Sequence, residues 1–230
     1  MITDPPILRI RRNFPRPPAA VVAALRGAAT GHLVDAMGGS GALHWHIKPL
    51  DKASPAFCGV ALTCDAGPAD NLAVFGALDA ARPGDVIIVA TAGHLAAAVI
   101  GDLVVGMARN CGVAAIVTEG TVRDEAGIIA VGLPVYCTGI SPNSPVRSGP
   151  GSVGLPIVVG GVAVEAGDIL VGDRDGVVVV PHQMAAKVAA RLAEVRAAEA
   201  ALEAKVKAGL RLPEFVTSLL GSTKVEEIPE

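Results

Sequence analysis

Residues 101–124 read GDLVVGMARNCGVAAIVTEGTVRD, and this stretch decides the fold class. An apolar run with helical spacing ends at residues 110–112, and a run rich in β-branched residues, 113–118, follows at once. A helix that leads directly into a buried strand is typical of an α/β core. After a Glu119-Gly120 turn the chain delivers Arg123 and Asp124 side by side.

Charged residues just beyond such a strand indicate a ligand site, because α/β sheets bind ligands at the carboxyl ends of their strands. Asp102, Arg123 and Asp124 would bring two carboxylates and a guanidinium to one rim. Such a set can hold a divalent cation and an anionic substrate. Each residue also has a simpler interpretation: Asp124 caps a helix, Arg123 pairs with a nearby acid, and Asp102 is solvated. Their convergence on one end of the sheet favours the site.

A second glycine-rich segment, residues 91–94, lies upstream of the same region. It follows the apolar strand expected at 85–90 and precedes a helix expected from about residue 95 to residue 110. Backbone N–H groups before a helix make a cradle for a carboxylate or a phosphate. His94 at its mouth is either an acid–base group or a residue that lines the rim.

Composition limits the class of protein. The chain has 230 residues, of which 51% are hydrophobic and only 3% aromatic, so the core is expected to consist of Val, Ala, Leu and Ile. A net charge of −3 provides no basic surface for nucleic acid. No apolar run reaches the roughly 18 residues of a membrane span, and the N-terminal stretch lacks the features of a signal peptide. These patterns predict a soluble, cytoplasmic protein with no membrane partner and with four free cysteines.

The order of motifs predicts one domain with two short extensions. Residues 1–18 form a basic, proline-rich arm, residues 19–209 a single α/β domain, and residues 210–230 a tail. Within the domain, strands expected at 57–64, 85–90, 113–118 and 134–138 alternate with helices. Residues 157–180 then alternate short apolar runs with turns, and Asp175-Gly176 is typical of a hairpin.

The last helix is expected over residues 183–208. Residues at intervals of 4, 3, 4, 3 and 4 form a seam that would face another helix or another subunit. The seam consists of Val188, Leu192, Val195, Glu199, Leu202 and Val206. Two interpretations of Glu199 stay open: a carboxylate tolerated near solvent, or a group delivered to a partner's site.

The pattern of Asp102, twenty intervening residues, and then Arg123-Asp124 resembles the 4-hydroxy-4-methyl-2-oxoglutarate aldolase family. That family also includes the regulator of ribonuclease activity A. The likeness covers most of the chain, and the spacing of the three charged residues is its most specific part. Further matches are Asp35-Ala36-Met37-Gly38, Ile47-Lys48-Pro49-Leu50, Asp70-Asn71, Pro83-Gly84-Asp85-Val86, Gly132-Leu133-Pro134-Val135 and Asp173-Arg174-Asp175-Gly176-Val177.

The resemblance implies a compact α/β/α sandwich with a barrel-like β core, assembled as a homotrimer or homohexamer with sites between subunits. It also implies a class II pyruvate aldolase with oxaloacetate decarboxylase side activity. In that scheme Asp124 ligates Mg²⁺ or Mn²⁺ directly, and Asp102 holds a metal-bound water. Glu199 from a neighbouring subunit's last helix also contacts the metal through water.

The same resemblance assigns the substrate contacts. Arg123 contacts the 2-oxo acid and its C4 hydroxyl, and the backbone of Gly93, His94 and Leu95 binds the pyruvate carboxylate. This chain departs from many relatives here, because Leu95 and three alanines follow His94. The departure bears on substrate preference.

The residue types agree with this chemistry. Cleavage beside a 2-oxo acid leaves a pyruvate enolate, which a chelated metal and a guanidinium stabilise. A Schiff-base mechanism would need a buried lysine, and the lysines at 48, 52, 187, 205, 207 and 224 lie outside the central strands. The competing hypothesis is a non-catalytic regulator that binds a ribonuclease. Such members lack the aspartate after the arginine, so Asp124 favours an enzyme. A third hypothesis is a structural oligomer with an idle acidic rim.

Overall fold

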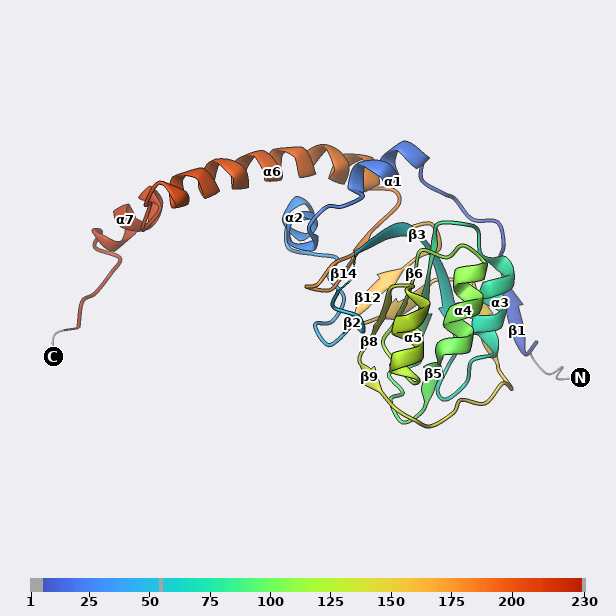
Figure 1. Ribbon diagram of the computed structural model, residues 1–230. Coiled ribbons are helices and arrows are strands. Elements are labelled where there is room, and N and C mark those ends of the chain that lie inside the picture. The colour runs from blue at the N-terminus through green and yellow to red at the C-terminus, as the bar shows by residue number, and fades with distance from the viewer. Residues whose placement is uncertain (1–5, 54–55, 229–230) are drawn as a thin grey trace, which may run out of the picture. The chain divides into compact units, whose positions relative to one another are not determined.

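The computed structural model describes residues 6–53 and 56–228 (Figure 1). Contacts between residues divide the chain into two units, residues 1–192 and residues 193–230. The first unit contains all the strands that the described residues form. The second contains the greater part of α6 (Ala185–Lys207) and all of α7 (Glu214–Leu220).

The main sheet of the first unit has nine strands, and its centre is parallel. β3 pairs with β4, β4 with β6, and β6 with β8, all in parallel. In spatial order the principal run is β1 (Leu8–Ile10), β10 (Gly151–Val153), β3 (Phe57–Asp65), β4 (Asp85–Ala90), β6 (Ala115–Thr118), β8 (Val135–Cys137) and β2 (Lys48–Pro49). This run of described strands is open at both ends, so the expected barrel-like core is not a closed barrel.

The remaining two strands form the hairpin that the Asp175-Gly176 signature predicts. β13 (Ile169–Gly172) pairs antiparallel with β14 (Val177–Val180). β13 also pairs with the first half of β3, from Phe57 to Val60, whereas β10 pairs with the last two residues of β3. This hairpin of the β-rich second half of the chain is therefore part of the same sheet as the strands of the first half.

The two faces of the sheet bury two different apolar clusters, since successive side chains of a strand point in opposite directions. Ile87 and Val89 of β4 pack on the face covered by α3 (Leu72–Ala80), α4 (Asp102–Asn110) and α5 (Glu125–Val131). These three helices lie side by side in Figure 1. Val86 and Ile88 pack on the other face, against the hairpin of β11 (Ile157–Val159) and β12 (Val162–Val164).

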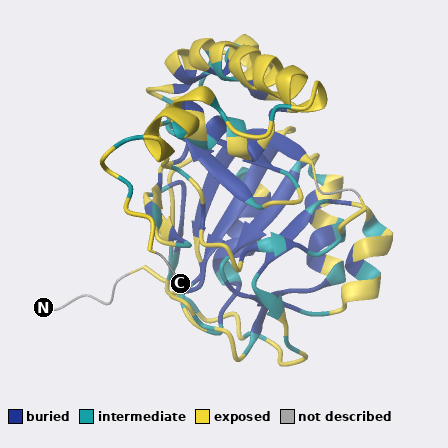
Figure 2. Cartoon of the chain, turned by 90° about the vertical axis from the view of Figure 1, so that its left-hand side faces the viewer, coloured by how far each residue is buried: buried dark blue, intermediate teal, exposed yellow. Residues whose placement is uncertain are grey.

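The predicted α/β class is confirmed, with one difference in its layers. A β-hairpin contributes to the second face, where the α/β/α scheme would place helices. Two further helices, α1 (Ala19–Leu25) and α2 (Thr30–Ala36), contact β3 and β14 respectively. Figure 2 shows the strands of the sheet as the buried, dark blue centre of the chain.

A small second sheet extends the three central strands. β5 (Ala98–Ile100), β7 (Thr121–Val122) and β9 (Gly139–Ile140) pair in parallel, in that order. They follow β4, β6 and β8 in the chain, so each central strand is continued by one short strand. Residues 98–100 were expected to be helical. They form β5 instead, and the helix begins at Asp102.

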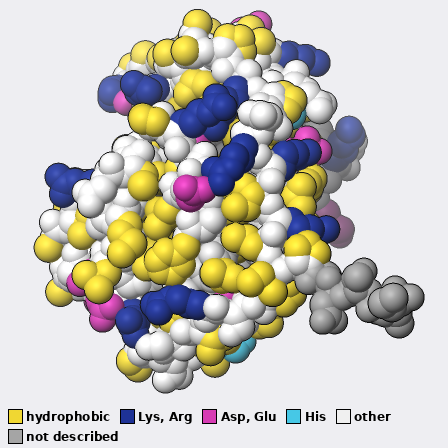
Figure 3. All heavy atoms as spheres, turned by 90° about the vertical axis from the view of Figure 1, so that its right-hand side faces the viewer, with side chains coloured by type: hydrophobic (Ala, Val, Ile, Leu, Met, Phe, Trp, Pro, Cys, Tyr) yellow, Lys and Arg dark blue, Asp and Glu magenta, His cyan; other side chains and the backbone are white. Residues whose placement is uncertain are grey.

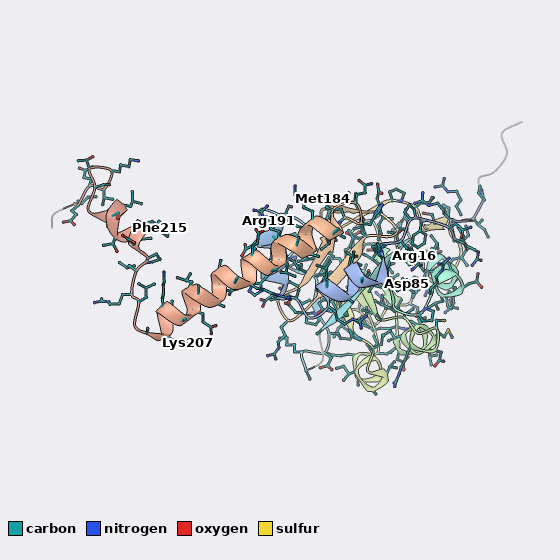
Figure 4. The ribbon with its side chains drawn as sticks, turned by 90° about the horizontal axis from the view of Figure 1, so that it is seen from above. Arg16, Asp85, Met184, Arg191, Lys207 and Phe215 are labelled. Carbon is teal, nitrogen blue, oxygen red and sulfur yellow. The ribbon has the colours of Figure 1, made fainter. Side chains whose placement is uncertain are left out.

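The described part of the N-terminal arm, from residue 6 onward, is anchored to the sheet. β1 pairs with β10, and the Arg16 guanidinium lies 2.6 Å from the Asp85 carboxylate. Both residues are labelled in Figure 4. Asp85 is only 1% exposed and also accepts the Arg82 N–H at 2.9 Å. A buried carboxylate needs such partners, so the arm belongs to the folded unit.

The second unit has no buried side chain among its described residues. The buried residues of α6 are Ala185, Val188 and Leu192, all within the first unit. Beyond them Leu202 and Val206 are about half exposed, and α7 buries nothing; its Phe215 is labelled in Figure 4. Short isolated helices are marginal in water, and most of their stability in proteins comes from tertiary packing. The described residues of this unit supply little such packing.

Two further features concern the surface of the described residues. None of their helices is both long enough and apolar enough to cross a membrane. On the face drawn in Figure 3, basic side chains are interspersed with acidic and hydrophobic ones.

Candidate functional site

The three charged residues singled out in the sequence line one pocket beyond the small sheet. Asp102 is the first residue of α4, and Arg123 and Asp124 follow β7 directly. All three line a cavity of about 240 Å³. The structure therefore brings them together, as the spacing of the sequence predicted. The chemical roles assigned to them remain predictions.

Gly101 allows Asp124 and Arg123 to approach the start of α4. A Cβ atom at residue 101 would lie 2.5 Å from Asp124 Oδ2 and 3.1 Å from Arg123 Cγ. The backbone of Gly101 is extended, with φ −133°, so a larger residue is excluded by these side chains and not by its own backbone.

Gly127 makes the reciprocal approach possible on α5. A Cβ atom there would lie 2.6 Å from Asp102 Oδ2. The Asp102 carboxylate thus lies against the helix that Asp124 begins, while the Asp124 carboxylate lies against the residue before Asp102. Because residues 101 and 127 are both glycines, the Asp102 and Asp124 carboxylates can approach each other.

Asp124 has a left-handed backbone, with φ 60° and ψ 45°. This conformation is uncommon for residues other than glycine and costs on the order of 1 kcal/mol. Asp124 occupies the N-cap position of α5, but its side chain makes no capping hydrogen bond. Its Oδ2 lies 3.2 Å from Arg123 Nε instead. The helix-capping interpretation therefore does not account for this carboxylate.

Arg123 is fixed at both ends of its side chain. Its backbone N–H donates to Ile100 O at 3.0 Å, and its guanidinium donates to the Ser144 hydroxyl as well as pairing with Asp124. The guanidinium is held at the rim by two partners. It is still about one-third exposed, so it can meet a ligand.

The donor set suits a hard divalent cation. Mg²⁺ takes oxygen ligands, keeps several waters and needs only one or two protein carboxylates. Asp102 and Asp124 supply two. Across residues 6–53 and 56–228 no three His, Cys, Asp or Glu side chains of this chain gather to hold a metal. A cation here would therefore take its remaining oxygens from water, from substrate or from another copy of the chain.

Glu199, the predicted third carboxylate, lies on α6 in the second unit and is exposed. Its seam neighbours Leu202 and Val206 are also exposed. Its assignment to a neighbouring subunit's metal site stays a prediction.

The expected carboxylate cradle at Gly93, His94 and Leu95 lies in a different pocket. Gly93 and Leu95 line a cavity of about 410 Å³ together with Glu119. The Gly93 N–H donates to Glu119 Oε1 at 3.2 Å, and the His94 N–H donates to Thr91 O at 3.0 Å. Two of the three expected donors are thus already engaged within the chain.

The N-terminal turn of α4 lines the pocket of Asp124 instead, through Asp102, Leu103 and Val104. The N-terminus of a helix carries unsatisfied N–H groups and a partial positive charge. The Leu103 N–H donates to Asp102 Oδ1 at 2.7 Å. The helix was expected to begin at about residue 95, but it begins at Asp102. Its N-terminal turn therefore lies in the pocket of Asp124 and not at residues 93–95.

Two further residues of the pocket, Asn71 and Arg147, were not singled out from the sequence as site residues. Asn71 is 2% exposed; its Nδ2 donates to Val99 O at 3.1 Å, while its buried Oδ1 has no partner among the described residues. Arg147 lies in the long loop after β9. One signal could have found it: Arg147 is the only charged residue between Glu125 and Glu165.

The cysteines give no sign of a nucleophile. All four are free, and Cys58, Cys64 and Cys137 are buried. Burial raises the pKa of Cys58 and of Cys137 to about 11, so both thiols stay protonated near neutral pH.

Comparison with known proteins agrees with this fold. The family model described as RraA-like, Aldolase/RraA, matches residues 30–179. The chain belongs to the RraA-like family. A protein from Halalkalibacterium halodurans, provisionally named 4-hydroxy-4-methyl-2-oxoglutarate aldolase, is 40% identical over 147 residues, which are 64% of this chain and 70% of that protein. A protein from Alkalilimnicola ehrlichii with the same provisional name is 32% identical over 115 residues, or 50% and 71% of the two chains.

Solved structures include relatives of another kind. RraAS2 from Streptomyces coelicolor, described as an unusual member of the RNase ES inhibitor RraA family, superposes with a TM-score of 0.74 at 26% identity, over 83% of this chain and all of that one. The RNA-processing inhibitor RraA from Thermus thermophilus gives 0.62 at 29% identity, over 67% and 93%. The family therefore contains proteins named as aldolases and proteins named as inhibitors.

Proposed function

We propose that this protein is a divalent-metal-dependent lyase, a class II pyruvate aldolase. Its substrates would be 4-hydroxy-2-oxo diacids such as 4-hydroxy-4-methyl-2-oxoglutarate or 4-carboxy-4-hydroxy-2-oxoadipate, cleaved to pyruvate and a second oxo acid. The observation that carries the proposal is the pocket in which Asp102, Arg123 and Asp124 meet, in a chain related to proteins named for this activity.

In this proposal the two carboxylates hold Mg²⁺ or Mn²⁺, Asp124 directly and Asp102 through water. When bound, the cation would act as a Lewis acid toward the keto oxygen and stabilise the enolate charge. Glu199 of a neighbouring copy would contact the cation through water, in a homotrimer or homohexamer. The exposed apolar residues of α6 and α7 support such an assembly.

The chain's own groups account for binding and proton transfer. In this proposal the N-terminal turn of α4, which lines the pocket, receives the substrate carboxylate, because a helix N-terminus carries unsatisfied N–H groups and a partial positive charge. Arg123 then lies beside the reacting carbons, where its fixed charge favours the enolate over the neutral ketone. Asp102, through a water, would accept the C4 hydroxyl proton as the carbon–carbon bond breaks.

The same arrangement would decarboxylate oxaloacetate, because loss of CO₂ leaves the same pyruvate enolate. This side reaction provides a direct test. Purified protein is mixed with oxaloacetate and Mg²⁺, and pyruvate is measured against protein treated with a chelator. We expect metal-dependent release of pyruvate.

The inhibitor relatives define a second candidate function, binding of a ribonuclease. A pure regulator would release no pyruvate with Mg²⁺ or with Mn²⁺ and would reduce ribonuclease activity on addition. That pair of results would overturn the aldolase proposal. The family resemblance implies that regulators of this type lack an aspartate after the arginine, so Asp124 supports the enzyme.

A further inference from the structure

We propose that Arg147 and Asn71 form the subsite for the half of the substrate that does not become pyruvate, with Arg147 binding its carboxylate. This inference rests on the proposed function and deepens it. It assigns the preference for diacids over monoacids to one guanidinium outside the triad of Asp102, Arg123 and Asp124.

The first support is the position of Arg147. It lines the same cavity of about 240 Å³ as Arg123 and Asp124, yet it comes from the loop after β9. The cavity therefore has two guanidinium-bearing residues in its wall. Arg123 is already paired with Asp124, at 3.2 Å. No carboxylate in the described part of the chain pairs with Arg147. An anionic ligand in this cavity would meet the Arg123 guanidinium, whose charge is compensated by Asp124, and the Arg147 guanidinium, whose charge is not compensated by a carboxylate of the described residues.

The second support is the rigidity of the backbone that carries Arg147. The preceding residue, Val146, pairs with the segment before α3: its N–H donates to Ala69 O at 2.8 Å, and its C=O accepts from Asn71 N–H at 3.0 Å. After Arg147, the N–H groups of Ser148 and Gly149 both donate to the Asp70 carboxylate, at 2.6 and 2.9 Å. Asp70 is 5% exposed. The loop is thus clamped on both sides of Arg147.

The side chain of Arg147 is also placed. Its guanidinium carbon lies 5.5 Å from the centre of the Phe75 ring, and Phe75 packs on the apolar cluster under α3. Stacking on an aromatic ring orients the guanidinium plane and leaves its N–H groups at the edge for a ligand. A preorganised guanidinium of this kind suits bidentate binding of a carboxylate.

Asn71 supplies an independent sign of a missing ligand. Its Oδ1 is buried and has no partner in residues 6–53 and 56–228, although Nδ2 is satisfied by Val99 O. A buried acceptor without a donor is costly, so the site is built for a group that donates a hydrogen bond. The C4 hydroxyl of a bound 4-hydroxy-2-oxo acid is such a group, and it would donate to Asn71 Oδ1 until its proton passes to the water on Asp102.

The test compares two substrates that differ only in the distal carboxylate: a 4-hydroxy-2-oxo diacid, and the monoacid in which a methyl group replaces that carboxylate. The variants are Arg147→Met, which removes the guanidinium but keeps an unbranched side chain, and Arg147→Lys, which keeps the charge. Arg174→Met is the matched control, since it removes the same charge from an exposed turn. Exchange of the pyruvate methyl protons with deuterium reports enolate formation without any distal group.

We expect Arg147→Met to lower kcat/KM for the diacid by about 10- to 100-fold, the loss expected for charge-assisted hydrogen bonds. Cleavage of the monoacid and proton exchange should change by less than about 3-fold, as for other surface changes. Arg147→Lys should fall between wild type and Arg147→Met on the diacid, because an ammonium cannot form the bidentate pair. Arg174→Met should match wild type.

The two proposals fail in different ways. If the wild-type protein cleaves neither substrate and exchanges no protons, the aldolase proposal is wrong and this inference goes with it. If the wild type is active but Arg147→Met affects both substrates equally, or neither, only the assignment of Arg147 is overturned. A thermal melt of each variant, expected to coincide with wild type, separates these results from misfolding.

Discussion

Two pockets of this protein contain a carboxylate beside glycine-rich backbone, and they differ in what that backbone does. In the first, Glu119 accepts hydrogen bonds from the N–H groups of Thr91, Gly93 and Gly160, at 3.3, 3.2 and 3.0 Å. In the second, Gly101 makes no such bond to Asp124; its missing side chain lets that carboxylate approach. The Glu119 carboxylate thus holds backbone segments together through hydrogen bonds, whereas the Asp124 carboxylate lies at the rim of its pocket beside Arg123.

The comparison shows how the two pockets differ. The Glu119 pocket is the larger, at about 410 Å³ against 240 Å³. The smaller pocket has the left-handed Asp124, the unsatisfied Asn71 acceptor and two arginines in its wall. Strain and unsatisfied polar groups persist only where the surrounding structure holds them, and they concentrate at functional sites. The unsatisfied acceptor and the two arginines, more than volume, separate the two pockets, because a left-handed residue, Ala92, also lies beside Glu119.

The largest expected effect lies in the smaller pocket. Asp124→Asn keeps the size of the side chain but removes the charge that would bind the cation directly. We expect turnover of oxaloacetate to fall at least about 1000-fold, since a Lewis acid contributes several kcal/mol. Steady-state rates at saturating Mg²⁺ measure this, with size-exclusion chromatography to show unchanged assembly. An active, correctly assembled variant would remove Asp124 as the metal ligand.

An intermediate effect is expected at Gly101, where the contrast with the Glu119 pocket is steric. In Gly101→Ala the new methyl group would start 2.5 Å from Asp124 Oδ2, so the carboxylate and Arg123 must move. We expect a loss of about 10- to 100-fold in kcat, because displacements of this size cost that much in catalytic geometry. Gly106→Ala on the same helix is the control, since nothing lies within 4 Å of its added Cβ. Equal activity in both variants would show that the approach at Gly101 is not needed.

The smallest effect on activity is expected in the larger pocket. Glu119→Gln replaces a carboxylate oxygen by an NH₂ group, which cannot accept from the backbone N–H it faces. We expect the free energy of unfolding to fall by about 1–3 kcal/mol, the cost of an unsatisfied buried partner. Deuterium exchange into pyruvate should stay within about 3-fold of wild type. A urea titration and the exchange rate measure the two effects. If deuterium exchange were lost while the free energy of unfolding stayed unchanged, the substrate carboxylate would be assigned to the backbone of residues 93–95, as the sequence predicted.

Local sequence patterns identified most of the fold. The all-apolar run DVIIVA is buried along its whole length as β4, and the Asp-Gly turn joins β13 to β14. The pattern failed at residues 98–100, because AVI suits the middle of an apolar helix as well as a short strand. Only pairing with β7, a long-range contact, decides between them.

The same limit applies to the site. Asp102, Arg123 and Asp124 were found because they follow recognisable elements in a short stretch of chain. Asn71 and Arg147 are 76 residues apart and meet only through the backbone bridge between Asp70 and Val146. In the expected cradle, the Gly93 N–H donates to Glu119, which lies 26 residues further along the chain. Spacing in the sequence does not reveal such long-range hydrogen bonds.

The continuation of β4, β6 and β8 into β5, β7 and β9 has a consequence for how the chain can change length. Residues of the pocket follow each short strand in turn, so the segments between the paired strands set their register. An extra residue inserted at 119–120 would shift Arg123 and Asp124 out of place together. Extra residues added where a helix leads into the next central strand, at the end of the sheet opposite the pocket, would leave the pocket unchanged. Relatives that differ in length should therefore carry their insertions at that far end.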